Sequence, residues 1–155
     1  MPRLSAGILL YRHNDAARIE VLIAHPGGPF FVKKDDAAWS IPKGEYDAGE
    51  DPLAAAEREF EEELGAPPPL GARVDLGELA QSRAKRVHAW AIEGDFDATK
   101  IASNTFKLEW PPKSGENVDF PEVDRAAWFE IPDATRKLVS GQVEFLDRLI
   151  EVLGQ

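Results

Sequence analysis

Apolar residues recur along the chain in short runs whose spacing is typical of strands. Runs that alternate with polar residues, or that are rich in β-branched and aromatic residues, predict strands. They lie at residues 5–12, 19–25, 74–80 and 85–93, with shorter extended pieces at 39–42, 105–110 and 126–130. Residues 13–17 predict a hairpin turn between the first two strands. The rest of the stretch 94–124 has no continuous pattern and is predicted to be irregular.

Two segments predict helices. The first spans residues 52–64, where Asp51 is a typical cap, Pro52 fits the first turn, and Gly65 is a typical stop. The second spans residues 140–153, with Val143, Leu146, Leu149, Ile150 and Leu153 on one face. Strands that surround one helix and end in another predict an α+β domain, in which helices cover a sheet on both sides.

Composition sets the broad class of protein. A length of 155 residues fits one domain, so residues 1–155 are predicted to form a single domain. No apolar run approaches the ~18 residues of a membrane span, and residues 1–13 do not resemble a signal peptide, so no membrane association is expected. The chain has no cysteine, which excludes disulfides and thiolate metal ligands and favours a cytoplasmic location.

The formal net charge of −10 narrows the choice of partners. Binding to nucleic acid requires Lys and Arg against the phosphates, so a nucleic-acid partner is not expected. A small phosphorylated ligand is compatible with this charge if a divalent metal screens the carboxylates. The alternative is that the charge serves solubility alone.

Nine of the acidic residues crowd into positions 44–66, around the first predicted helix. At ~100° per residue, Glu59, Glu62 and Glu63 share one helix face about 100° wide. The predicted buried stripe borders this face and consists of Leu53, Ala56, Phe60 and Leu64. Like charges held against a core tend to be neutralised by protonation or by a metal, and carboxylates suit Mg²⁺ or Mn²⁺. The alternative is an ordinary solvated, Glu-rich helix.

Residues 44–66 fit the pattern G-x5-E-x7-R-E-U-x-E-E-x-G-U, where U is a bulky aliphatic residue. The fixed positions are Gly44, Glu50, Arg58, Glu59, Glu62, Glu63 and Gly65. The segment resembles the Nudix box of the Nudix hydrolase family. Phe60 and Ala66 depart from the pattern at U positions, which concerns local packing more than chemistry. The rest of the chain is compatible with the family in length and strand order, but is far less specific.

The resemblance implies an α/β/α sandwich with a mixed sheet, in which the box forms a loop–helix–loop that holds divalent metals. It implies Mg²⁺ as the cofactor, with Mn²⁺ as the alternative. It also implies hydrolysis of a nucleoside diphosphate linked to another group, by attack of water on a phosphorus. A homodimer is compatible with the family, although no feature of this sequence marks a dimer surface.

The resemblance also assigns roles to residues of the box. The implied metal ligands are Glu59, Glu62 and Glu63. Glu50 would be a supporting carboxylate, and Arg58 would orient the glutamates. Gly44 would form the tight turn, and the backbone carbonyl of Lys43 would complete the metal shell.

The general base of such enzymes often lies on a later loop. Here the loop 114–124 offers Glu116, Asp119 and Glu122. Glu122 is favoured, because a glutamate shortly before an aromatic strand recurs in the family. The alternative is that Glu122 is an ordinary acid of a surface loop.

The stretch WSIPKG, residues 39–44, concerns the substrate. It resembles the lead-in of the Nudix branch that cleaves diadenosine polyphosphates and diphosphoinositol polyphosphates. Lys43 would contact a phosphate as a point charge. Arg83 and Lys85, with Arg86, would reach distal phosphates, or would lie at a solvated strand end. The candidates for stacking on a base are Trp39, Trp90, Trp110 and Trp128.

The sequence therefore predicts a divalent-metal-dependent pyrophosphohydrolase that acts on a small nucleotide, with dinucleoside polyphosphates as the first choice. One alternative is a housecleaning enzyme for nucleoside triphosphates or oxidised nucleotides, or an enzyme for nucleotide sugars. A rival of another class is a catalytically silent Nudix domain used for nucleotide binding or regulation. The intact set of three glutamates argues against that rival.

Overall fold

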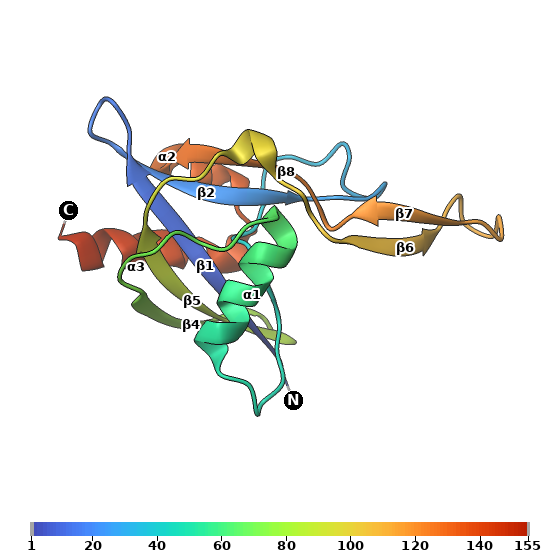
Figure 1. Ribbon diagram of the computed structural model, residues 1–155, viewed down its shortest axis with the longest axis horizontal. Helices are drawn as coiled ribbons and strands as arrows, with labels where there is room; N and C mark the ends of the chain where they lie inside the picture. Colours follow the sequence, from blue (N-terminus) through green and yellow to red (C-terminus); the bar gives the residue numbers. More distant parts are fainter. Residues whose placement is uncertain (1, 155) are drawn as a thin grey trace.

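The computed structural model describes residues 2–154, which form a mixed six-stranded sheet with helices on both faces (Figure 1). The strands of this sheet are β1 (Arg3–His13), β2 (Ile19–Pro26), β3 (Lys43–Glu45), β4 (Val74–Ser82), β5 (Lys85–Glu93) and β8 (Val123–Glu130). Five of them lie in the order β4-β5-β1-β2-β8, and the short β3 pairs with β1. The pair β1–β5 is parallel, and the other neighbouring pairs are antiparallel.

The remaining elements flank or leave this sheet. The helices are α1 (Pro52–Leu64), α2 (Ile131–Lys137) and α3 (Glu144–Leu153), and the short 3₁₀ helices are η1 (Ala98–Lys100) and η2 (Ser140–Gln142). The strands β6 (Thr105–Glu109) and β7 (Asn117–Pro121) pair with each other and form a separate two-stranded sheet. We call this unit the β6–β7 hairpin; it projects away from the body of the molecule in Figure 1.

The central strands separate two hydrophobic cores, because successive side chains of a strand point to opposite faces. On β1, Ile8 and Leu10 pack into the core beneath α1, whereas Leu9 belongs to the core beneath α2 and α3. Phe60 of α1 and Phe145 of α3 are fully buried on their respective faces. The predicted α+β class and the α/β/α sandwich with a mixed sheet are therefore confirmed.

Helix α1 begins and ends at the predicted residues. The Asp51 side chain accepts a hydrogen bond of 3.0 Å from the backbone N–H of Ala54, which caps the first turn. Gly65 adopts a left-handed conformation with φ of 90°, and its N–H donates to the carbonyl of Glu61. The buried residues of α1 are Ala55, Ala56, Phe60 and Leu64. Leu53 is only partly buried, and Ala55 joins the predicted stripe.

The second half of the chain departs from prediction in three places. The stretch 94–124 contains η1 and strand β7 in addition to the expected strand near 105–110. The short helix α2 was not predicted, because it has seven residues and little apolar periodicity. The last helix begins at Glu144, four residues later than expected, because Ser140–Gln142 form a 3₁₀ turn. No helix within residues 2–154 is long and apolar enough to cross a membrane.

Candidate active site

Strand β3 and helix α1 approach each other so closely that the contact requires glycine. A Cβ atom added to Gly44 would overlap the carboxyl group of Glu59, so any larger residue would displace that carboxyl group. One residue earlier, the backbone N–H of Lys43 donates a hydrogen bond of 3.2 Å to Glu63 Oε1. Strand β3 therefore fixes two of the three glutamates that were predicted to hold a metal.

Arg58 links Glu50, which precedes the helix, to Glu59 and Glu62. It forms an ion pair with Glu50 and lies 3.7 Å from a carboxylate oxygen of both Glu59 and Glu62. Glu50 also accepts a hydrogen bond of 3.1 Å from the backbone N–H of Asp47. This bond and the Arg58 guanidinium lower the pKa of Glu50, so Glu50 stays ionised as the counter-charge of Arg58. The geometry places Arg58 where it can orient the glutamates.

Two glutamates of the helix face, Glu59 and Glu63, have raised pKa values. Burial, followed by the neighbouring Glu62 carboxyl, raises the pKa of Glu59 to about 7. Burial raises the pKa of Glu63 to about 8, against the opposing effect of the Lys43 backbone N–H. Buried carboxyls with neighbours of like charge resist ionisation unless a cation lies beside them. The two side chains are therefore suited to a cation that would hold them ionised.

Glu122 meets the helix face across a small cavity. The cavity has a volume of about 150 Å³ and is lined by Ala24, Pro26, Ser40, Lys43, Glu63, Glu122 and Val123. Burial and the charge of Glu62 raise the pKa of Glu122 above its ordinary value. The predicted general base, a predicted metal ligand and the predicted phosphate contact thus line one cavity.

The main chain holds Glu122 in place from two sides. Its N–H donates a hydrogen bond of 2.8 Å to the carbonyl of Asn104, and its carbonyl accepts one of 3.0 Å from the N–H of Gly27. Asn104 in turn donates its N–H to the carbonyl of Glu62, over 2.9 Å. Asn104 therefore joins the end of the acidic helix to the loop of Glu122. Sequence reasoning missed Asn104, because nothing in its surroundings marks a main-chain bridge.

Ser40 and Gln142 were also missed, and both support the lead-in segment of the site. Gln142 is fully buried, and its side-chain carbonyl accepts a hydrogen bond of 2.9 Å from the N–H of Ile41. Its amide group donates to Ser40 Oγ and to Gln81 Oε1, each over 3.0 Å. Ser40 could have been found, because it lies within the WSIPKG stretch. Gln142 gave no comparable signal.

The basic residues that were predicted to contact phosphates differ in their surroundings. Burial, followed by the charge of Lys85, lowers the pKa of Lys43. Arg83 is exposed in the turn between β4 and β5, and does not line the cavity of Glu63. Arg86 is paired with Glu78 at 3.0 Å. Of the predicted phosphate contacts, Lys43 lines the cavity, whereas Arg83 and Lys85 do not.

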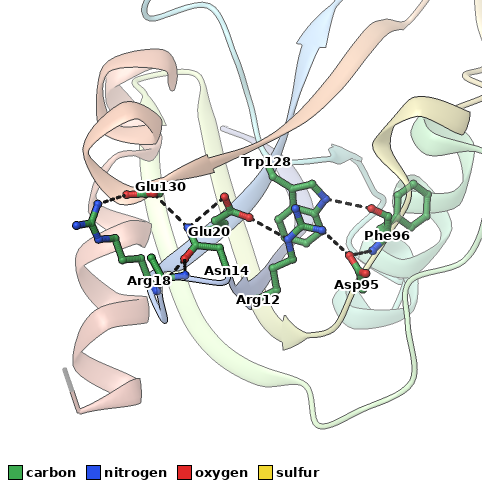
Figure 2. Close-up of polar contacts among 9 residues, drawn as sticks. Arg12, Asn14, Arg18, Glu20, Asp95, Phe96, Trp128 and Glu130 are labelled. Atoms are coloured by element: carbon green, nitrogen blue, oxygen red, sulfur yellow. Dashed lines mark hydrogen bonds and ion pairs between the residues drawn. The ribbon is translucent and has the colours of Figure 1, made fainter.

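Three of the four tryptophans pack within the two hydrophobic cores or against them. Trp39 and Trp90 are buried, with 3% and 8% of their surface exposed. Trp128 lies beneath the guanidinium of Arg12, at 4.0 Å, and its Nε1 donates to the carbonyl of Phe96 (Figure 2). Arg12 is itself fixed by Glu20 and Asp95. Trp110, on the β6–β7 hairpin, remains the candidate for stacking on a ligand.

The oxygen atoms of the acidic helix face suit a divalent cation in their chemistry. Within residues 2–154, no three carboxylate or imidazole side chains converge closely enough to form a complete metal shell. The chemistry of the donors nevertheless fits a hard cation, since Glu59 and Glu63 are carboxyls with raised pKa on one helix face. The absence of a side chain at Gly44 lets the Glu59 carboxyl group lie directly against β3. Glu59, Glu62 and Glu63, with the Lys43 carbonyl, are the groups available to such an ion.

Comparison with known proteins gives a family match over nearly the whole chain. Residues 1–149 match the family model described as NUDIX domain. An RNA pyrophosphohydrolase of Rhodospirillum rubrum is 29% identical over 139 residues, which cover 84% of this chain and 79% of that protein. An 8-oxo-(d)GTP phosphatase of Mycolicibacterium smegmatis is 37% identical over 122 residues. The match covers 70% of this chain, but only 34% of that longer protein.

Solved structures give the same fold. An Ap4A hydrolase of C. elegans, solved as a binary complex, superimposes with a TM-score of 0.67 at 23% sequence identity. The match covers 97% of this chain and 98% of the Ap4A hydrolase.

Proposed function

The chain belongs to the Nudix hydrolase family and is a hydrolase of phosphoanhydride bonds, and on this premise we propose that its substrate is a dinucleoside polyphosphate. Nudix hydrolases generally use divalent metal ions, and we propose Mg²⁺ here, with Mn²⁺ as a substitute. The observation that carries the proposal is the cavity in which Lys43, Glu63 and Glu122 meet beside the acidic helix face.

The chain's own groups have distinct tasks in this reaction. Lys43 lines the cavity and binds a phosphate of the substrate as a point charge. Glu59, Glu62 and Glu63 hold the cation, and Arg58 keeps the first two oriented. When bound, the cation neutralises the negative charge of the diphosphate and makes water more acidic. Phosphoryl transfer depends mainly on such positioning and electrostatics, which suits a helix that is capped at both ends.

Glu122 is proposed as the general base. Burial raises its pKa above the ordinary value, which makes its carboxylate a stronger base, and its backbone is held from two sides. Glu122 takes a proton from the attacking water, whose oxygen forms the new bond to phosphorus. The P–O bond of the phosphoanhydride breaks, and the leaving nucleotide keeps the bridging oxygen.

Two observations support a dinucleoside polyphosphate as the substrate. The WSIPKG stretch places Lys43 at the cavity, as the lead-in of that branch implies. The match in fold also covers 98% of the Ap4A hydrolase of C. elegans. The second candidate is a nucleoside triphosphate, and the 37% identity with the 8-oxo-(d)GTP phosphatase favours it.

A Mg²⁺-dependent hydrolysis screen tests the proposal. Its substrates are dinucleoside polyphosphates, nucleoside triphosphates, an oxidised nucleoside triphosphate, ADP-ribose, nucleotide sugars and diphosphoinositol phosphates, and mass spectrometry identifies the products. Release of ATP from diadenosine tetraphosphate is the expected result, and it should be lost in Glu63→Gln. Preference for the oxidised triphosphate would support the second candidate. If none of the substrates is hydrolysed although Mg²⁺ binds, the result would contradict the proposed hydrolase activity and favour a regulatory domain.

A further inference from the structure

An aromatic pair stands at the β6–β7 hairpin, outside the cavity described above. Trp110 follows β6, and its ring meets the ring of Phe30 edge to face, with centroids 5.5 Å apart and planes at 84°. Phe30 is 58% exposed, although it is a large apolar side chain. In an edge-to-face pair the edge of one ring covers one face of the other, so the partner does not cover the remaining ring faces. We call Phe30 and Trp110 the aromatic shelf.

The shelf is joined to the active-site cavity by two segments of main chain. The β6–β7 hairpin begins after Asn104 and ends before Glu122, which are hydrogen-bonded to each other. The loop that carries Phe30 leaves β2 at Pro26, which also lines the cavity. Both segments therefore start at the cavity and meet again at the shelf.

Contacts between the cavity and the shelf hold the loop that carries Phe30 against the β6–β7 hairpin. The ring of Phe106 lies so close to Gly28 that a Cβ atom there would be 3.0 Å from the Phe106 ring. Phe106 is paired across the hairpin with Phe120, and Leu108 with Val118. An isolated two-stranded sheet is marginal in water, so this apolar face needs the loop against it. The shelf is thus held in place before any ligand binds.

The distance from the cavity to the shelf points to the length of the ligand. Trp110 lies five residues beyond Thr105, at the root of the hairpin, so at ~3.4 Å per residue the hairpin reaches at most about 17 Å from its root. By the other route, Phe30 lies four residues beyond Pro26, which is at most about 14 Å at the same rise. A planar group at the far end of a polyphosphate chain can span this distance.

We propose that Phe30 and Trp110 form a distal subsite that stacks on the second nucleobase of a dinucleoside polyphosphate while its phosphates occupy the cavity of Lys43 and Glu63. This inference rests on the proposed function and deepens it, since it assigns a place to the moiety that distinguishes a dinucleotide from a nucleoside triphosphate. Stacking needs only a ring face, so the subsite accepts any base. It therefore selects for the length of the ligand rather than for the identity of the base.

Binding of two non-hydrolysable ligands in the presence of Mg²⁺ tests the subsite. The ligands are diadenosine tetraphosphate with methylene groups in place of the phosphoanhydride oxygens, and the matching analogue of ATP. Phe30→Ala and Trp110→Ala are each expected to weaken binding of the dinucleoside analogue about tenfold and to leave the ATP analogue within about twofold. Trp110→Phe, which keeps a ring face, should retain most of the affinity. Leu70→Ala is the control, because Leu70 is 94% exposed and does not line the cavity.

Unchanged binding of the dinucleoside analogue in both alanine variants would overturn the inference, as would an equal loss for both analogues. Absence of binding to the parent chain would overturn it as well. Thermal unfolding of each variant shows whether the fold is kept; if Trp110→Ala unfolds, Phe30→Ala decides, since its side chain is mostly exposed. Failure of the hydrolysis screen with selective binding intact would contradict only the proposed activity.

Discussion

Helix α1 and the β6–β7 hairpin both contribute to the proposed site, but they are held in place in different ways. Helix α1 is capped at both ends, buries Phe60 and Leu64, and is fixed from β3 through Lys43 and Gly44. The hairpin forms a separate sheet and is steadied by a loop. The difference suggests that the groups that act on phosphate lie on the rigid element, while recognition of a distal moiety lies on the outlying one.

Substitutions in the two regions should therefore have different effects. Changes on α1 should affect the reaction whatever the substrate, because the phosphate chemistry depends on fixed groups. Changes on the hairpin should affect only ligands that reach it.

The largest effect is expected from the glutamates of α1. Glu62→Gln and Glu63→Gln should each lower kcat by more than about 100-fold, since even residues behind metal ligands typically cost 10- to 100-fold. The thermal unfolding temperature should hardly change, because glutamine keeps the shape of the side chain. Glu61→Gln is the control, since Glu61 is exposed and outside the predicted ligand set. Near-normal kcat in both variants would remove the metal assignment.

A smaller but general effect is expected where β3 meets α1. Gly44→Ala places a methyl group where the Glu59 carboxyl lies, which should cost about 1–3 kcal/mol of stability and displace that carboxyl. The value of kcat should fall for dinucleoside and mononucleotide substrates alike. Gly49→Ala is the matched control, because a Cβ atom there meets nothing within 4 Å. Equal stability and kcat in the two variants would show that the approach of β3 to α1 is not needed.

The contrast between α1 and the β6–β7 hairpin also explains which parts of the fold and the site could be predicted from the sequence. Asp51, Pro52 and Gly65 are local signals, so both ends of α1 could be placed from neighbouring residues alone. The glutamates follow from the helical repeat. Their meeting with Glu122 could be expected only from the family resemblance, because the contact depends on how β8 and β2 pair.

The hairpin could be predicted only in part. The alternation of residues 105–110 indicated β6, but every residue of β7 from Asn117 to Asp119 is exposed, so no burial pattern marked it. Asn104 acts through its main chain, which is independent of residue type. Gln142 reaches Ile41 across a large separation in sequence. Such contacts follow from the tertiary fold and leave no local trace.

A moderate effect is expected from pH and Mg²⁺ together. Folding raises the pKa of Glu59 to about 7 and of Glu63 to about 8, so between their ordinary values and about pH 8 the folded chain binds more protons than the unfolded chain. Stability of the metal-free protein should therefore fall as pH rises through this range. Mg²⁺ binds the ionised carboxylates, so it should stabilise more at pH 8.5 than at pH 5.5. At ten to one hundred times its Kd, Mg²⁺ should add roughly 1–3 kcal/mol.

Thermal unfolding with and without Mg²⁺ at the two pH values measures this effect. Glu63→Gln is the control, because it removes one of the titrating groups and should reduce the dependence on pH. An equal shift of the unfolding temperature at both pH values would place Mg²⁺ binding elsewhere than on these glutamates.

The smallest effect is expected on the polar face of the hairpin, and it separates that face from the aromatic shelf. Lys107 lies 3.0 Å from Asp119 across the hairpin, but both side chains are more than half exposed, at 73% and 56%. Such pairs contribute about 0–1 kcal/mol, so Lys107→Ala should lower stability by less than about 1 kcal/mol. Binding of the dinucleoside analogue should stay close to that of the parent chain, in contrast to Trp110→Ala. If Lys107→Ala weakens binding as much as Trp110→Ala does, the hairpin acts through its charge or its overall position, and stacking on the shelf is not what distinguishes it from α1.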